Sequence, residues 1–146
     1  MKPQHRTVEV LLVEDSEADA DLVREAIEGG KLIVNLSVVG DGVEAMAYLR
    51  RDGRYADASR PDLVLLDLNL PRMSGQEVLR EVKTDPDLGH IPIVVLTTSA
   101  ADEDVLRSYK LHANAYITKP VEFESFITIV NKVTEFWLSL VVLPKG

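Results

Sequence analysis

Short runs of apolar residues alternate with segments of helical periodicity along almost the whole chain. Two of these runs, residues 63–66 and 91–96, are apolar throughout, which is typical of strands buried on both faces. Strands that alternate with helices pair in parallel, because each helix returns the chain to the starting edge of the sheet. We therefore predict an α/β protein with five helices and a five-stranded parallel sheet, with strands at residues 8–13, 32–39, 63–66, 91–96 and 113–117.

Local signals mark where the helices begin and end. Gly29-Gly30 ends the first helix, and Asp41-Gly42 opens the second. Ser74 and Glu77 have the spacing of a capping box, which opens the third helix after the polar loop RRDGRYADASRPD at residues 50–62. The fourth helix is expected over residues 99–111, and a fifth from residue 123. The apolar positions predicted for the first two helices are Ala18, Leu22, Val23, Ala26 and Ile27, then Val43, Ala45, Met46 and Leu49.

Length and charge limit the classes of protein. The chain has 146 residues, of which 46% are hydrophobic, and this suits a single domain over residues 1–146 with a core at about 7–135. Its formal net charge of -8 argues against binding to nucleic acid or to an anionic membrane. The absence of cysteine excludes thiolate zinc sites and thiol nucleophiles. With no secretory signal and no apolar run of membrane-spanning length, a cytoplasmic protein is the simplest expectation.

Polar residues follow the predicted strands where each strand ends. Glu14-Asp15 follows the first strand, Asp67 the third, Thr97 the fourth and Lys119 the fifth. In an open α/β sheet, ligands bind outside these carboxyl ends, so we expect the side chains to meet there. Gathered carboxylates repel one another unless a hard cation lies between them, and their oxygen atoms suit Mg²⁺. The cost of burying the Asp67 carboxylate after an apolar strand can therefore be offset if it shares a metal ion with Glu14-Asp15 and pairs with Lys119.

Such a cluster has a definite chemistry. A carboxylate with a metal on one oxygen can use the other oxygen to attack a phosphoryl group, while the metal and a lysine stabilise the phosphoryl oxygens. An aspartyl phosphate on Asp67 would result. The hydroxyl group of Thr97 can then move toward the phosphate and carry its loop with it, which would make a switch.

The set of Glu14-Asp15, Asp67, Thr97, Tyr116 and Lys119-Pro120, in this order, resembles the response-regulator receiver domain of two-component signalling. The resemblance implies a doubly wound, flavodoxin-like (βα)5 fold with strand order 2-1-3-4-5. It implies that Asp67 accepts the phosphoryl group from a sensor histidine kinase, and that the protein catalyses only its own phosphorylation and dephosphorylation. The roles it implies for other residues are Mg²⁺ binding by Glu14, Asp15, Asp67 and the backbone carbonyl of Asn69, phosphate contact by Lys119, switching by Thr97 and Tyr116, and a cis peptide bond at Pro120.

Within this family, the chain is most similar to the stand-alone regulators of cyanobacterial and other bacterial phytochromes. The similarity lies in the residue 50–62 loop, the strings LLDLNLP and VVLTTS, and the tail FWLSLVVLPKG at residues 136–146. It implies a phytochrome kinase as phosphoryl donor, an unidentified downstream protein and a homodimer formed by the C-terminal region. The apolar arc of the fifth helix is also wider than one core-facing stripe, so we expect an interface at Ile129, Phe136, Trp137 and Leu140.

Other interpretations of these residues remain open. Any one strand-end acid can simply be a helix cap, and Lys119 can be a loop lysine. A haloacid-dehalogenase-type phosphatase also attacks phosphate with a strand-end aspartate, but it needs an acid two residues later, where this chain has Asn69. A receiver-like fold that serves only as a binding module is a further alternative, and it predicts the loss of at least one residue of the site.

Overall fold

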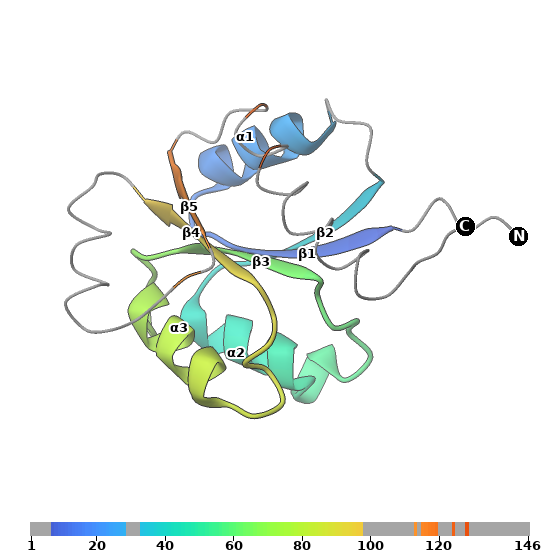
Figure 1. The fold of residues 1–146 in the computed structure, drawn as a ribbon, viewed down its shortest axis with the longest axis vertical. Helices are drawn as coiled ribbons and strands as arrows, with labels where there is room; N and C mark the ends of the chain where they lie inside the picture. Colours follow the sequence, from blue (N-terminus) through green and yellow to red (C-terminus); the bar gives the residue numbers. More distant parts are fainter. Residues whose placement is uncertain are drawn as a thin grey trace, which may run out of the picture.

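The computed structural model describes residues 7–28, 33–97, 113, 115–119, 124 and 128. The described strands form one sheet in the order β2-β1-β3-β4-β5, and all four neighbouring pairs are parallel. This is the predicted topology, and it places β1 and β3 side by side in the middle of the sheet (Figure 1). The strands are β1 Val8–Val13, β2 Val34–Val39, β3 Leu63–Asp67, β4 Ile93–Thr97 and β5 Ala115–Thr118.

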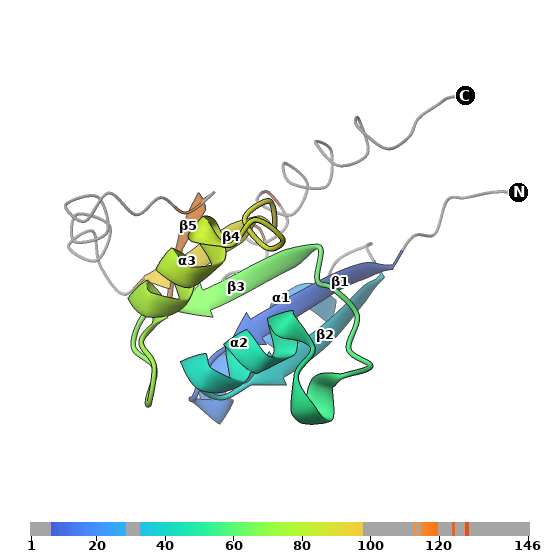
Figure 2. The same ribbon diagram turned by 90° about the horizontal axis from the view of Figure 1, so that it is seen from below.

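Helices cover both faces of the sheet. Helix α1 (Glu17–Glu28) lies on one face, and α2 (Gly42–Arg50) and α3 (Gly75–Thr84) lie on the other (Figures 1 and 2). Alternate residues of a strand point to opposite faces, and β1 therefore feeds two separate cores. Leu11 and Val13 pack with α2 and α3, whereas Val10 and Leu12 pack with α1. All five residues of β3 are buried, which explains why its first four residues are apolar without alternation.

Each described helix begins at a polar cap. The Ser16 hydroxyl accepts the Asp19 N–H before α1, and the Asp41 carboxylate accepts the Glu44 N–H before α2. The predicted capping box at Ser74 and Glu77 is present at the start of α3. These caps satisfy backbone donors that have no partner inside the helix, so they fix the first turn of each helix. Their common position above the carboxyl ends of the strands is where a ligand would bind.

The burial of α1 and α2 differs in part from the predicted pattern. Ala18 and Leu22 are exposed, and Ala20 is buried in their place. Val43, in the first turn of α2, is also exposed. The spacing of apolar residues in the sequence defines a broad arc on the surface of each helix. The contact with the sheet selects only the part of that arc centred on Ala20, Val23 and Ile27 in α1.

The strand bounds also shift by one or two residues. β4 begins at Ile93 rather than residue 91, since Pro92 has no N–H to donate to a ladder. β5 begins at Ala115 rather than residue 113, and β3 includes Asp67 itself. The loop at residues 50–62 contains a short 3-10 helix, η1 (Gly53–Tyr55), whose Tyr55 ring lies 5.3 Å from that of Tyr48.

The helices predicted over residues 99–111 and from residue 123 fall outside the described residues, except that Glu124 and Thr128 are helical. The division into a core at about 7–135 and an extension at 136–146 therefore stays a prediction.

Candidate functional site

Three segments far apart in the sequence meet at the carboxyl edge of the sheet. Glu14 and Asp15 follow β1, Asp67 ends β3 and Lys119 follows β5. β2 lies on one side of β1 and β3 on the other, so the chain changes winding direction here. A crevice forms at such a point, because neighbouring connections leave to opposite faces of the sheet.

The three acids lie close enough to share one cation. Glu14, Asp15 and Asp67 each offer a carboxylate oxygen, and these atoms all lie within 4.8 Å of one another. Glu14 and Asp67 are buried, and Asp15 is exposed. Hard divalent cations take oxygen ligands, and like charges at such distances repel one another unless they are neutralised. The donor set therefore fits a divalent metal ion.

The carboxylate of Asp67 is oriented through both of its oxygens. Oδ1 accepts the backbone N–H of Asn69 at 3.1 Å, and Oδ2 accepts a hydrogen bond from Lys119 Nζ at 3.1 Å. Helix α3 begins directly behind it at Gly75, where a Cβ would lie only 2.3 Å from the Asp67 carbonyl oxygen. Only glycine allows this approach, so the loop over residues 68–74 turns tightly next to Asp67.

Lys119 contacts three carboxylates. Its Nζ lies 2.9 Å from Glu14 Oε1, 2.9 Å from Asp19 Oδ2 and 3.1 Å from Asp67 Oδ2. The pairing of Asp67 with Lys119 follows the sequence prediction, but the contact with Asp19 was missed. A capping pattern, Ser16-x-x-Asp19, is visible in the sequence, and it indicates a helix start rather than a partner for a lysine 100 residues away.

The electrostatics of the cluster follow from this packing. The pKa of Glu14 is raised to about 7: burial is the largest cause, Lys119 opposes it, and the nearby Asp67 adds to it. Burial alone would lower the pKa of Lys119, but its hydrogen bonds to Glu14, Asp19 and Asp67 raise that pKa above its usual value. Lys119 is therefore a permanent cation, while the charge of Glu14 depends on pH near neutrality.

The loop over residues 68–74 is fastened to α2. Arg72 has a φ of 66°, which is uncommon for a residue other than glycine. Its guanidinium group donates two hydrogen bonds to Asp41, Nε to Oδ2 at 3.0 Å and Nη2 to Oδ1 at 3.2 Å. Gly42 admits the Met73 backbone, since a Cβ there would lie 2.1 Å from the Met73 carbonyl oxygen. The loop that carries Asn69 is thus held at both ends, by α2 and by α3.

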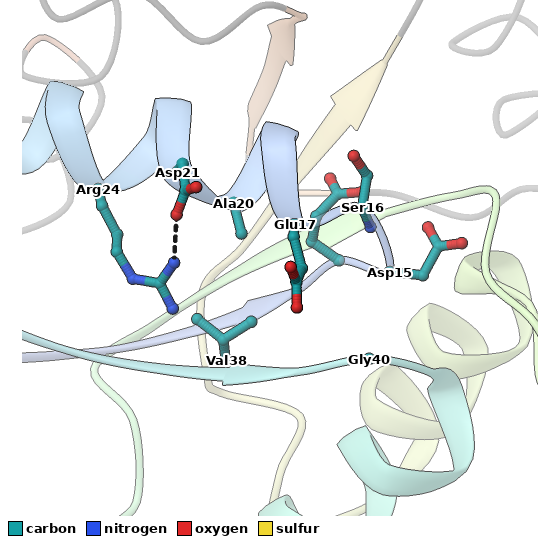
Figure 3. A pocket seen from close by; sticks show the side chains of 9 residues that line it. Asp15, Ser16, Glu17, Ala20, Asp21, Arg24, Val38 and Gly40 are labelled. Atoms are coloured by element: carbon teal, nitrogen blue, oxygen red, sulfur yellow. Dashed lines mark hydrogen bonds and ion pairs between the residues drawn. The ribbon is translucent and has the colours of Figure 1, made fainter.

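A cavity of about 490 Å³ adjoins the acids between α1 and β2. Figure 3 shows Glu17, Asp21 and Arg24 of α1 on one side, with Val38 of β2 and Gly40, which follows β2, on the other. The ion pair between Arg24 and Asp21, 2.8 Å long, lies at the end away from Asp15. Glu14 and Asp15 line this cavity beside the first turn of α1, whereas Asp67 does not line it.

The remaining predicted residues are described only in part. Tyr116 lies on β5 opposite Val95, is half-buried and packs against the core beneath α2 and α3. Thr97 is the last residue of β4, beside Thr118 of β5. The predicted cis bond at Pro120 and the predicted interface residues lie outside the described residues: Ile129, Phe136, Trp137 and Leu140.

Comparison with known proteins gives a consistent result. Residues 10–131 match the family described as response regulator receiver domain. The response regulator Rcp1 of Synechocystis sp. is 47% identical over 137 residues, which covers 94% of this chain and 93% of that protein.

Two solved structures are similar in sequence and in fold. The phosphorylated cyanobacterial phytochrome response regulator RcpA is 50% identical with a TM-score of 0.76, and the match covers 96% of this chain and all of that one. The Mn²⁺-bound form of Rcp1 is 46% identical with a TM-score of 0.73, covering 94% of this chain and 99% of that one. Within the part of this chain that the structure describes, no helix is both long enough and apolar enough to cross a membrane.

Proposed function

Because this chain belongs to the family of response regulator receiver domains, we propose that it accepts a phosphoryl group on Asp67 from a sensor histidine kinase and relays the signal by a conformational switch. Response regulators of this kind are signalling proteins rather than classical enzymes. The observation that carries the proposal is the arrangement of Asp67. Its carboxylate is buried, held by Lys119 and the Asn69 N–H, and grouped with two further acids in a metal-suited cluster.

In this reaction, one oxygen of Asp67 attacks the phosphorus atom of a phosphohistidine. The new bond joins that oxygen to phosphorus, the bond from phosphorus to the imidazole nitrogen breaks, and the imidazole keeps the electron pair. Lys119 provides N–H donors to the phosphoryl oxygens, and the Asn69 N–H keeps the carboxylate facing the same way. The same residues serve dephosphorylation, in which water attacks the phosphorus atom, the bond from phosphorus to the Asp67 oxygen breaks, and inorganic phosphate leaves the regenerated carboxylate.

We propose that the metal ion is Mg²⁺. Its ligands would be Glu14, Asp15, Asp67 and the backbone carbonyl of Asn69. When bound, Mg²⁺ would neutralise charge on the carboxylates and on the phosphoryl oxygens. Support comes from the three oxygens within 4.8 Å and from the relative Rcp1, which has an Mn²⁺-bound form. Mn²⁺ and Mg²⁺ share a preference for oxygen ligands and octahedral geometry.

We assign the switch to Thr97, Tyr116 and the bond before Pro120. Thr97 ends the strand next to Asp67, and Tyr116 is opposite Val95 on the adjacent strand, so movement at the phosphate can pass from β4 to β5. A phosphoryl group shifts the populations of two states only if it binds them differently, and we propose that its hydrogen bond with the Thr97 hydroxyl forms in one state and not in the other.

The partners follow from the relatives. Rcp1 is named a response regulator and RcpA a phytochrome response regulator, and we propose a phytochrome-type kinase as the phosphoryl donor for this chain. We also propose action in the cytoplasm, an unidentified downstream protein and a homodimer formed through Ile129, Phe136, Trp137 and Leu140.

The test is the intact mass of the protein after incubation with acetyl phosphate, with and without Mg²⁺. We expect a single phosphoryl adduct that requires the metal and is lost in Asp67→Asn. The matched control is Asp57→Asn, since Asp57 is an exposed aspartate of the residue 50–62 loop and should leave the adduct unchanged. An adduct that persists in Asp67→Asn would exclude Asp67 as the acceptor. No adduct from acetyl phosphate or from a phosphorylated histidine kinase would favour the binding-module alternative.

A further inference from the structure

Asp19 is the one acid around Lys119 that the proposed function does not use. It lies in the first turn of α1, and its Oδ2 is 2.9 Å from Lys119 Nζ. The corresponding contact of Asp67 is 3.1 Å long. Lys119 therefore contacts a residue outside the proposed acceptor and metal set at least as closely as it contacts the acceptor.

The local structure of α1 directs Asp19 toward Lys119. In a capping box, the acid three residues after the cap accepts the N–H of the cap residue. Here the Ser16 N–H is already donated to Glu14 Oε2 at 3.2 Å, while the Asp19 N–H is donated to the Ser16 hydroxyl at 3.2 Å. The backbone of Asp19 is thus fixed by the cap, and its side chain is left to reach across to Lys119.

The three partners of Lys119 differ in their access to water. The side chain of Asp19 is 41% exposed, whereas those of Glu14 and Asp67 are 1% and 5% exposed. A carboxylate that loses its partner is costly when buried, but at the surface water replaces the lost hydrogen bond. Asp19 is therefore the partner that Lys119 can leave at the lowest cost.

A phosphoryl group on Asp67 increases the demand for Lys119. An ammonium group has three N–H donors, and three carboxylates surround it here. Phosphorylation uses one oxygen of Asp67 and brings three anionic oxygens to the same place. Lys119 already donates to Asp19 and Asp67 and forms an ion pair with Glu14, so the phosphoryl oxygens would compete with these partners for its ammonium group.

We propose that Asp19 is a positioning residue that holds Lys119 in the unphosphorylated state and competes with the phosphoryl group for its ammonium group. The proposal rests on the phosphoryl-acceptor function of Asp67. Asp19 then lowers the affinity of the site for a phosphoryl group without touching that group. A substitution that removes the charge of Asp19 but keeps the shape of its side chain should remove this competition. Glu14 and Asp67 would continue to hold Lys119.

The test is the affinity of the full chain for beryllofluoride, a mimic of the phosphoryl group, measured by titration at saturating Mg²⁺ and 0.15 M salt. In Asp19→Asn we expect binding about 3 to 10 times tighter than in the wild type, the range for one partly solvated hydrogen bond to a charged group. Asp19→Glu, which keeps the charge and the reach, should return the affinity to near that of the wild type.

Two further variants separate this role from a general effect of charge. Asp21→Asn removes the same charge from the same helix, but Asp21 pairs with Arg24 rather than with Lys119, and its affinity should match the wild type. In a Lys119→Ala background, adding Asp19→Asn should change the affinity by less than a factor of about two, because the competition has been removed. Circular dichroism melting with Mg²⁺ establishes that each variant is folded.

The possible results are distinct. Unchanged or weaker binding in Asp19→Asn would overturn the inference while leaving the proposed function in place, provided that the wild type binds the mimic. An equal gain in Asp21→Asn would reduce the effect to net charge and would also overturn the inference. Failure of the wild type to bind beryllofluoride with Mg²⁺ would count against the proposed function itself, and the inference would fall with it.

Discussion

At the scale of single residues, the main feature of the site is that one described lysine compensates several acids. One lysine serves Glu14, Asp19 and Asp67, and it is itself only 15% exposed. Buried carboxylates of this kind are costly for the fold unless they are paired or bind a metal. The cluster of buried carboxylates is therefore expected to lower the stability of the metal-free fold.

Glu14 gives this cost a pH dependence. Its pKa is raised from 4.5 to about 7, mainly by burial, so between these values the folded protein binds a proton that the unfolded chain does not. The free energy of unfolding of the metal-free protein should therefore fall as pH rises from about 5 to about 7, by on the order of 1 to 3 kcal/mol. Urea titrations at a series of pH values measure this change.

The isosteric variant Glu14→Gln isolates the contribution of that carboxyl. Its urea midpoint should lack this part of the pH dependence, while Glu17→Gln, at an exposed position in the same segment, should retain it. Mg²⁺ competes with the proton, so its stabilising effect on the wild type should increase over the same pH range. Equal pH profiles for wild type and Glu14→Gln would show that Glu14 is not the titrating group.

At the scale of elements, the contact between α3 and β3 determines where Asp67 lies. Gly75 is the first residue of α3, and the added methyl group of Gly75→Ala would lie 2.3 Å from the Asp67 carbonyl oxygen and 2.6 Å from the Leu68 Cα. Both are backbone atoms, so the helix must move. We expect Gly75→Ala to destabilise the protein by about 1 to 3 kcal/mol and to weaken phosphorylation of Asp67.

The control for this variant is Gly40→Ala. Gly40 also lies at the carboxyl edge, after β2, but nothing lies within 4 Å of an added Cβ, so stability should change by less than about 0.5 kcal/mol. Thermal melting and the acetyl phosphate assay measure the two effects. Equal stability of both variants would mean that α3 does not depend on this close approach.

The elements themselves were largely predictable, because strand runs and caps are local features of sequence. The capping box at Ser74 and the parallel order of the strands were both correct. The apolar spacing that includes Leu22 and Val43 predicted the two helices, but both side chains are exposed, since periodicity gives the width of an apolar arc and not which part of it meets the sheet. Asp19 was missed because its partner is 100 residues away, and a one-dimensional pattern carries no information on such a distance.

At the scale of the whole molecule, the predicted self-association assigns a role to the C-terminal region. A chain ending at Glu135 lacks Phe136, Trp137 and Leu140, which are three of the four predicted interface residues. Since apolar burial drives such contacts, the shortened chain should dissociate at concentrations where the full chain is dimeric.

Sedimentation at equal concentrations measures this difference, and removal of residues 1–6 instead provides a control truncation that should leave the mass unchanged. Identical masses for the full chain and the chain ending at Glu135 would remove the tail from the interface.

The hydrogen bonds of Lys119 also have a consequence for biosynthesis. They join residues that are 100 and 52 positions apart, and β5, which leads to Lys119, is the last strand of the sheet to leave the ribosome. Contacts of such long sequence separation form late, because closing the intervening chain costs entropy before any contact offsets it. A nascent chain that displays Glu14, Asp15 and Asp67 still lacks Lys119, so the carboxylate cluster gains its lysine only after β5 has been made and has joined the sheet.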